Sequence, residues 1–201
     1  MDQLEKKFFE LSVLGILADR QSIEKYYNTP IAKNQTIIDF FIEKENMQEN
    51  AKLQIEKWIN QHQEKINKIR SLATHERQIG FKSRENFLNW YLKSEKQCCY
   101  CGVKEEDLNK YFNKDNLQYK TARQRGTSLE IERIITAPKE KNIYSEENCA
   151  LACYICNNAK SDFISPQDFK SIAKGINQFW VDKVGVNAVF PENSDIWDKA
   201  F

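Results

Sequence analysis

Apolar positions recur at helical spacing through roughly the first 95 residues of the chain. Leu4, Phe8, Leu11 and Ala18 follow one another at intervals of four, three and seven residues, and nearby apolar residues widen the stripe. This spacing predicts one helix over residues 2–27. The tripeptide Asn-Thr-Pro at residues 28–30 then supplies a turn signal, so we expect the helix to end there.

A second apolar stretch starts near Thr36 and continues to about residue 70. Its periodicity fits either one helix or two helices with a break near residues 46–50. Gly80 ends this region. Ser83 can cap a short helix that follows it and carries Phe87, Trp90 and further apolar residues.

The pattern changes near residue 97, where helical periodicity gives way to cysteines, turn signals and alternation. Two strands are predicted, at residues 128–134 and 148–152, and a helix is expected from about Asn157. Ser165 followed by Pro166 predicts a further helix start, because serine caps helices and proline suits the first helical position. Residues 113–127 are expected to form a polar, partly basic loop, and an irregular segment is expected from Gly185.

The net charge of the chain does not by itself indicate a polyanionic partner such as a nucleic acid. Lys and Arg total 30 against 29 Asp and Glu, a formal net charge of +1, so any basic surface must be local. Aromatic residues make up 12% of the chain, which is typical of a folded protein. The apolar stretch from Phe8 to Ala18 is too short to span a bilayer, and no secretion leader is visible. We therefore expect a cytoplasmic protein.

Four of the six cysteines form two C-x-x-C pairs, Cys98 with Cys101 and Cys153 with Cys156. Two such pairs supply the four thiolates that zinc prefers. Ordinary buried cysteines are the competing interpretation. A set of four protein ligands is closed, so the predicted zinc is structural rather than catalytic. The pairs are separated by residues 102–152, which must form an inserted subdomain.

The predicted strand at residues 128–134 carries two acids, Glu130 and Glu132, at alternate positions. Alternation places both on one face of the strand, opposite Leu129 and Ile131. A pair of carboxylates on an exposed face suits a hard divalent ion. A solvated strand face without any metal has the same pattern.

The segment 144–162, which reads YSEENCALACYICNNAKSD, resembles the second half of the HNH (ββα-metal) nuclease motif. In that family a strand ending in Asp-His is followed by a loop, an asparagine, a second strand and a helix. The helix begins at a C-x-x-C pair, and the residue after its last cysteine binds the catalytic ion. The resemblance covers about residues 97–165, with a continuation to 180, and implies an α+β fold with a zinc-pinned ββα unit and a C-terminal helix.

Carried over position by position, the resemblance implies roles for five residues. Glu132 matches the metal-binding acid, and Arg133 stands where the general-base histidine usually is. Asn148 matches the asparagine that fixes the loop. Asn157 matches the second ligand of the catalytic ion, and Lys160 matches a basic residue at the end of the motif.

Both motif histidines are missing, and this departure bears on the chemistry. An asparagine after the last cysteine is similar to the phage endonuclease VII type of resolvase, and its amide oxygen can bind Mg²⁺. Arg133 stays protonated and cannot act as a base, although it can stabilise charge on a phosphate. Glu130 is the first candidate for the base and His75, expected in a loop, is the second; His62 is expected to pack on a helix.

The resemblance implies a metal-dependent endonuclease that hydrolyses phosphodiester bonds of DNA, with RNA left open, using structural Zn²⁺ and catalytic Mg²⁺ or Mn²⁺. The alternative is a catalytically degenerate HNH-fold zinc module that binds nucleic acid or a protein partner. Basic side chains are candidates for phosphate contacts, although a solvated basic loop has the same composition. These candidates are Lys120, Arg123, Arg125, Lys139, Lys141 and Lys160.

The expected organisation is a helical region over residues 1–95, an HNH-like domain over 96–184 and a C-terminal tail over 185–201. The helical region carries no chemical motif, and its aromatic residues at helical spacing are expected in a core. Small bacterial HNH proteins often act beside an ATPase or another sensor in anti-phage systems. The resemblance therefore implies that the helices bind such a companion protein.

Overall fold

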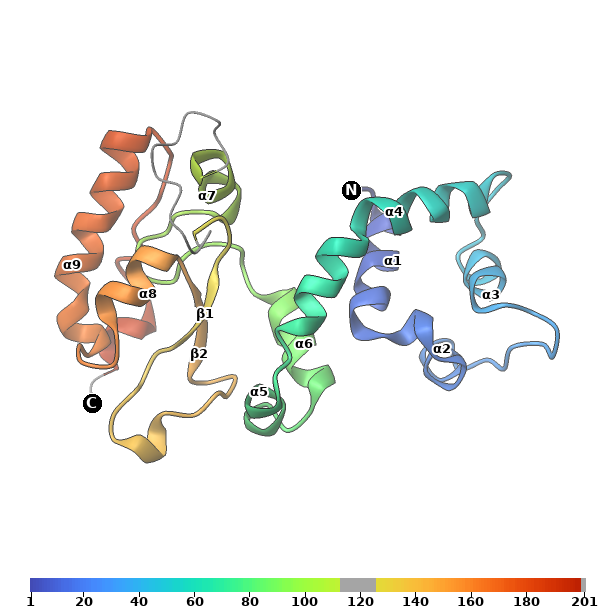
Figure 1. Cartoon of the computed structure of the whole chain (residues 1–201), viewed down its shortest axis with the longest axis horizontal. Helices are drawn as coiled ribbons and strands as arrows, with labels where there is room; N and C mark the ends of the chain where they lie inside the picture. Colours follow the sequence, from blue (N-terminus) through green and yellow to red (C-terminus); the bar gives the residue numbers. More distant parts are fainter. Residues whose placement is uncertain (113–125, 200–201) are drawn as a thin grey trace. The chain divides into compact units, whose positions relative to one another are not determined.

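The computed structural model describes residues 1–112 and 126–199 (Figure 1). The chain divides into two compact units, residues Met1–Leu92 and Lys93–Phe201, called unit 1 and unit 2 below. Within the described ranges, no helix is both long enough and apolar enough to cross a membrane.

Unit 1 is entirely helical in its regular structure. Its elements are α1 (Gln3–Leu14), the 3-10 helix η1 (Ile16–Ala18), α2 (Arg20–Tyr27), α3 (Ile37–Lys44), α4 (Ala51–Ser71), α5 (His75–Gly80) and α6 (Arg84–Lys93).

The expectation of a single helix over residues 2–27 is wrong, because the chain breaks after Leu14. Gly15 adopts a left-handed conformation with φ of +84° and caps α1 through its backbone N–H. Asp19 then accepts a hydrogen bond from the Ser22 N–H and starts α2. Both residues are strong helix-end signals, and they override an apolar stripe that continues across them.

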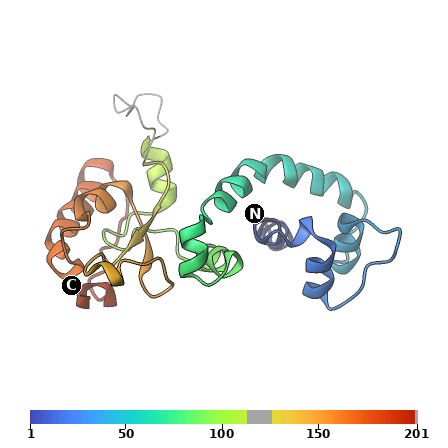
Figure 2. The ribbon, with the colours of Figure 1, turned by 60° about the horizontal axis from the view of Figure 1, so that its bottom comes forward.

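The second apolar stretch forms two helices, α3 and α4, which separate near Asn46 and Asn50, both at positive φ. The core of unit 1 gathers where α1, α3 and α4 pack, and α1 lies beside the long α4 (Figure 2). Four of the aromatics expected in a core, Phe8, Phe40, Phe41 and Trp58, lie in this cluster. Trp90 was also expected in a core, but it is partly exposed and packs against Phe81 and Phe87 outside the cluster.

The two histidines of the chain both belong to unit 1. His62 packs against the ring of Phe9 and shares a 2.7 Å hydrogen bond with Glu5. These contacts join α4 to α1, and they confirm the expectation that His62 packs on a helix. His75 was expected in a loop, but it is the first residue of α5, preceded by Thr74 at the cap position.

Unit 2 combines helices with one small sheet, so the chain is an α+β protein. The described elements of this unit are α7 (Glu105–Phe112), β1 (Glu130–Arg133), the 3-10 helix η2 (Lys139–Lys141), β2 (Cys149–Ala152), α8 (Tyr154–Lys160), α9 (Pro166–Phe179), the π-helical turn η3 (Trp180–Val184) and the 3-10 helix η4 (Asp195–Asp198).

The two predicted strands are confirmed and pair with each other. β1 and β2 are antiparallel, with Glu130 opposite Ala152 and Arg133 opposite Cys149. Helix α8 follows β2 directly and packs against β1, so strand, strand and helix form a compact ββα unit (Figure 1). Helix α9 packs against α8 and begins at Ser165 and Pro166 as predicted.

Three elements of unit 2 differ from the expectations. Helix α8 begins at Tyr154 rather than near Asn157, because Cys153 caps it by accepting the Cys156 N–H. Helix α7 was not predicted. The segment after Gly185 is not wholly irregular, since η4 buries Ile196 and Trp197.

The first cysteine pair turns at Gly102, which has φ of +73°. Its backbone N–H donates to the Cys98 carbonyl at 2.9 Å, closing a tight turn around the sulfur atoms. A Cβ atom at this position would lie 1.9 Å from the carbonyl oxygen of Val189. Nearby, Asn177 donates to the carbonyls of Cys101 and Ala188, so α9 fastens the C-terminal segment onto the turn.

Replacing Gly102 with alanine is expected to destabilise unit 2 by about 2–5 kcal/mol. Alanine is strained in the left-handed backbone conformation, and its Cβ would also clash with the Val189 carbonyl. Gly175→Ala is the matched control. Among the described residues, no atom beyond the neighbouring backbone of α9 lies within 4 Å of its added Cβ, so alanine there is expected to stabilise α9 by about 0.5–1 kcal/mol. Thermal or urea unfolding measures both; equal stability of the two variants would contradict this account.

Candidate metal centre and active site

The four cysteines of the two C-x-x-C pairs form one buried cluster. The Sγ atoms of Cys98, Cys101, Cys153 and Cys156 all lie within 4.8 Å of one another, and each residue is at most 1% exposed. The Cys101 and Cys153 sulfurs are 3.7 Å apart. Zinc–sulfur bonds of about 2.3 Å require tetrahedral edges of roughly 3.8 Å, so this donor set fits a zinc ion.

Backbone groups around the cluster favour bound thiolates. The Cys156 N–H points at the Cys153 sulfur at 3.4 Å. Burial opposes ionisation of Cys98, but hydrogen bonds from the other three thiols hold its pKa well below the usual range. Hydrogen bonds to the neighbouring thiols raise the pKa of Cys101 and of Cys156 in turn, so a bound cation is needed for all four sulfurs to be thiolates together. Cys99 and Cys149 lie outside the cluster, and neither forms a disulfide.

Asn148 ties down the loop between β1 and β2. Its side-chain oxygen accepts the Ile135 N–H at 2.8 Å, and its amide nitrogen lies 2.9–3.0 Å from the carbonyls of Ile135, Lys141 and Ile143. Asn148 is itself 7% exposed. One side chain thus closes the whole loop, and Lys139 and Lys141 are exposed on it.

Glu132 was expected on an exposed strand face, and this is wrong because α8 covers that face. Glu132 is 5% exposed, and its Oε1 atom lies 3.0 Å from the ammonium of Lys160. Tyr100, located between the cysteines of the first pair, donates its hydroxyl to the same oxygen at 3.2 Å. Burial raises the pKa of Glu132, while Lys160 and Tyr100 oppose that rise.

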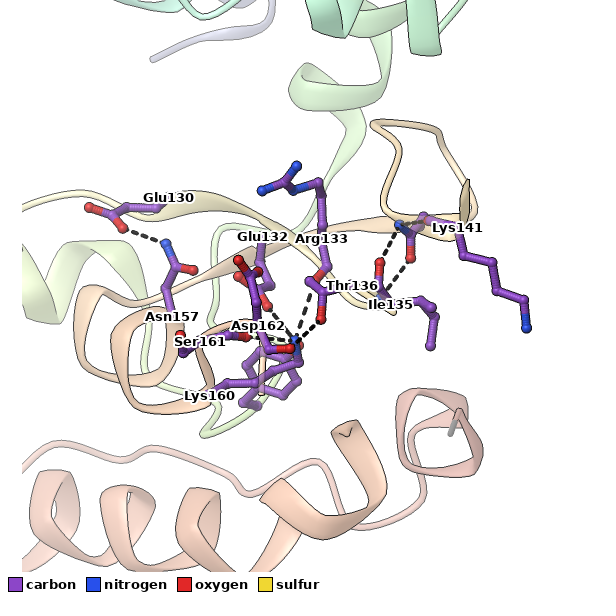
Figure 3. Close-up of polar contacts among 12 residues, drawn as sticks. Glu130, Glu132, Arg133, Ile135, Thr136, Lys141, Asn157, Lys160, Ser161 and Asp162 are labelled. Atoms are coloured by element: carbon purple, nitrogen blue, oxygen red, sulfur yellow. Dashed lines mark hydrogen bonds and ion pairs between the residues drawn. The ribbon is translucent and has the colours of Figure 1, made fainter. Parts of the chain in front are cut away.

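Lys160 is completely buried, so its ammonium does not reach the surface as the expected phosphate contact would require. Besides Glu132, the ammonium contacts the carbonyl oxygens of Arg133 and Ser161, each at 3.4 Å (Figure 3). Oxygens from β1 and from the end of α8 therefore surround one cation. This arrangement fixes the helix to the strand.

Asn157 contacts Glu130 rather than Glu132. Its Nδ2 atom donates to Glu130 Oε2 at 2.6 Å, and the two side chains point toward one another (Figure 3). Both residues are partly exposed. Two matched pairs, Glu130 with Asn157 and Glu132 with Lys160, thus line the contact between β1 and α8, which we call the β1–α8 seam. The seam offers carboxylate and amide oxygens, the ligands that Mg²⁺ and Mn²⁺ prefer.

Arg133 is partly exposed, and its guanidinium carbon lies 4.8 Å from the ring centroid of Tyr144. This stacking holds the arginine next to the loop that Asn148 closes. The remaining candidates for phosphate contacts, Lys120, Arg123 and Arg125, lie outside the described residues.

Tyr100 is the residue of this site that the sequence analysis missed. It occupies a spacer position of a C-x-x-C pair, where metal-ligand spacing is independent of residue type. Neither periodicity nor the family resemblance marks it. Only the folding of the first pair against β1 brings its hydroxyl to Glu132.

No protein-family model matches the chain, and no curated protein matches it. Among solved structures, the chain is similar to the rare-cutting HNH restriction endonuclease PacI, with 26% sequence identity and a TM-score of 0.38. The match covers 50% of this chain and 66% of that chain. The similarity therefore extends over part of each protein.

Replacing Cys156 with alanine is expected to abolish metal retention by the cluster and to unfold much of unit 2, since three thiols leave a tetrahedral set incomplete. Elemental metal analysis and thermal unfolding measure this. Cys149→Ala is the control, because Cys149 is also buried but lies outside the cluster. Unchanged metal content and melting temperature in the Cys156 variant would rule out the four-cysteine site.

Proposed function

We propose that unit 2 is an HNH-type nuclease that hydrolyses phosphodiester bonds of DNA with the help of a divalent ion. The β1–α8 seam carries this proposal. Acids from a strand meet an amide from the helix that follows the second cysteine pair, and the chain order matches the family motif. RNA stays open as a substrate, because the seam offers no contact that would distinguish the two sugars.

In this proposal Glu132 and Asn157 hold the divalent ion. Within the described part of the chain, both contacts to the Glu132 carboxylate end on Oε1, which leaves Oε2 for a ligand. Asn157 uses its amide nitrogen for Glu130, which leaves its carbonyl oxygen. When bound, Mg²⁺ or Mn²⁺ polarises the phosphoryl oxygen and stabilises the leaving alkoxide.

The four-cysteine cluster is assigned to a structural Zn²⁺. All four of its protein ligands are thiols, and all are buried, so no position is left for a substrate. The zinc would hold the first cysteine pair to the start of α8 and so keep the seam assembled.

Two groups would act on the nucleic acid. Arg133 cannot accept a proton, but its fixed positive charge can stabilise a phosphate as charge builds on it. Lys139 and Lys141, exposed on the loop that Asn148 closes, can contact the phosphate backbone without reading sequence. The same proposal assigns unit 1 to binding a companion ATPase or sensor protein of a cytoplasmic anti-phage system.

A second candidate function is a degenerate module that binds nucleic acid or protein without cleaving. The Lys160–Glu132 ion pair favours it, because a buried ammonium already neutralises the acid proposed to bind the ion. Both histidines of the chain also lie in unit 1. Such a module would bind DNA with an affinity that falls steeply with salt and would show no metal-dependent cleavage.

Replacing Glu132 with glutamine is expected to abolish plasmid cleavage that the wild-type protein performs with Mg²⁺ or Mn²⁺ and not with EDTA. Glutamine keeps the shape of the side chain but removes the charge that attracts the ion. Glu192→Gln is the control, because Glu192 also pairs with lysines of unit 2, but its partners Lys170 and Lys174 belong to α9 and not to the seam. Cleavage by the Glu132 variant at the wild-type rate would place the active site elsewhere.

A further inference from the structure

Glu130 and Glu132 lie on the same side of β1, yet they contact different residues of α8. Glu132 pairs with Lys160, whereas Glu130 accepts a 2.6 Å hydrogen bond from Asn157 one helical turn earlier. A hydrogen bond to a carboxylate at this distance is charge-assisted and about twice as strong as a neutral one. The side chain of Asn157 is therefore held in one orientation.

That orientation determines what Asn157 offers to a ligand. A side-chain amide has a nitrogen end that donates and an oxygen end that accepts, and only the oxygen can bind a cation. With the nitrogen bonded to Glu130, the oxygen is turned away from that carboxylate and toward the side of Glu132 (Figure 3). Rotation of the amide by a half turn would instead present its N–H donors to the ion.

Glu132 is held in the same manner. Its Oε1 atom is bonded to Lys160 and Tyr100, so the direction of its second oxygen is fixed. Each proposed ligand of the ion thus has one polar atom engaged by the protein. Residues that orient metal ligands in this way typically change metal affinity by about 10–100-fold when they are removed.

We propose that Glu130 is a positioning residue, which holds the amide of Asn157 so that its oxygen faces the divalent ion. This inference rests on the proposed function, because it presupposes an ion at the β1–α8 seam. In this proposal Glu130 neither binds the ion directly nor transfers a proton. A positioning role thus replaces the general-base role that the sequence suggested, and the Glu130 carboxylate acts through Asn157.

The test is a double-mutant cycle on Mn²⁺ affinity, measured by isothermal titration calorimetry on the zinc-loaded full chain. Glu130→Gln is expected to weaken Mn²⁺ binding about tenfold, because a neutral amide can donate or accept and no longer fixes Asn157. Asn157→Ala is expected to weaken binding as well. In the Asn157→Ala background, Glu130→Gln should have no further effect, since the residue through which it acts is gone.

Glu43→Gln is the matched control. Glu43 accepts a 2.7 Å hydrogen bond from the side-chain amide of Gln35 in unit 1, so the same chemical change is made in the other unit. Its Mn²⁺ affinity should equal that of the wild type. Zinc content and melting temperature of every variant show that the fold is kept.

Four outcomes would overturn the inference. An equal loss of Mn²⁺ affinity from Glu130→Gln with and without Asn157 would make Glu130 a direct ligand. Lost cleavage with unchanged Mn²⁺ affinity would make it the base. Wild-type protein that binds no Mn²⁺ would refute the ion site and this inference together, whereas wild-type binding that Glu130→Gln leaves unchanged would refute the inference alone.

Discussion

The gathering of four thiols from two distant segments is the contact on which unit 2 depends. The sheet of this unit consists of two strands of four residues each, and an isolated two-stranded sheet is marginally stable in water. The cluster joins the first cysteine pair to the start of α8, and the Cys99 N–H donates to Leu151 of β2. A tetrahedral ion at this point would hold the two segments against the sheet, in addition to the buried apolar side chains of the unit such as Phe169 and Trp180.

The polar contacts of the β1–α8 seam follow from that constraint. Because Cys153 caps α8 and Cys156 lies in its first turn, the cluster sets where Asn157 and Lys160 meet the strand. A buried ion pair such as Lys160–Glu132 is seldom a net gain in stability, since removing both charges from water costs several kcal/mol for each ion. The clearer consequence of the pair is positional, since it fixes the Glu132 carboxylate between β1 and α8.

Local signals explain which parts of the fold were predictable. Apolar–polar alternation predicts the strands, and the Ser165-Pro166 cap predicts the start of α9. The C-x-x-C spacing alone predicts that the four cysteines gather in one cluster. The break at Gly15 and Asp19 was missed because an apolar stripe crosses it. Helix α7 and the buried Ile196 and Trp197 were missed because their burial depends on packing against distant segments.

The sequence singles out Glu130, Glu132, Asn157 and Lys160, but it does not show which of these side chains contact one another. Strand alternation correctly places Glu130 and Glu132 on one side, yet it cannot show that α8 covers that side and buries Glu132. Nor can it pair Glu130 with Asn157, or bring Tyr100 to the acid from a spacer position. These contacts depend on how the helix rests on the strand, which the cysteine cluster determines.

The most direct test of this account is the metal stoichiometry of the purified chain, measured by native mass spectrometry. We expect one tightly held zinc per chain, which brief EDTA treatment at neutral pH leaves in place. We also expect one added Mn²⁺, which EDTA removes. A chain that carries no zinc and folds with its cysteines oxidised or unoccupied would contradict the central claim that a metal-bound thiol cluster organises the seam.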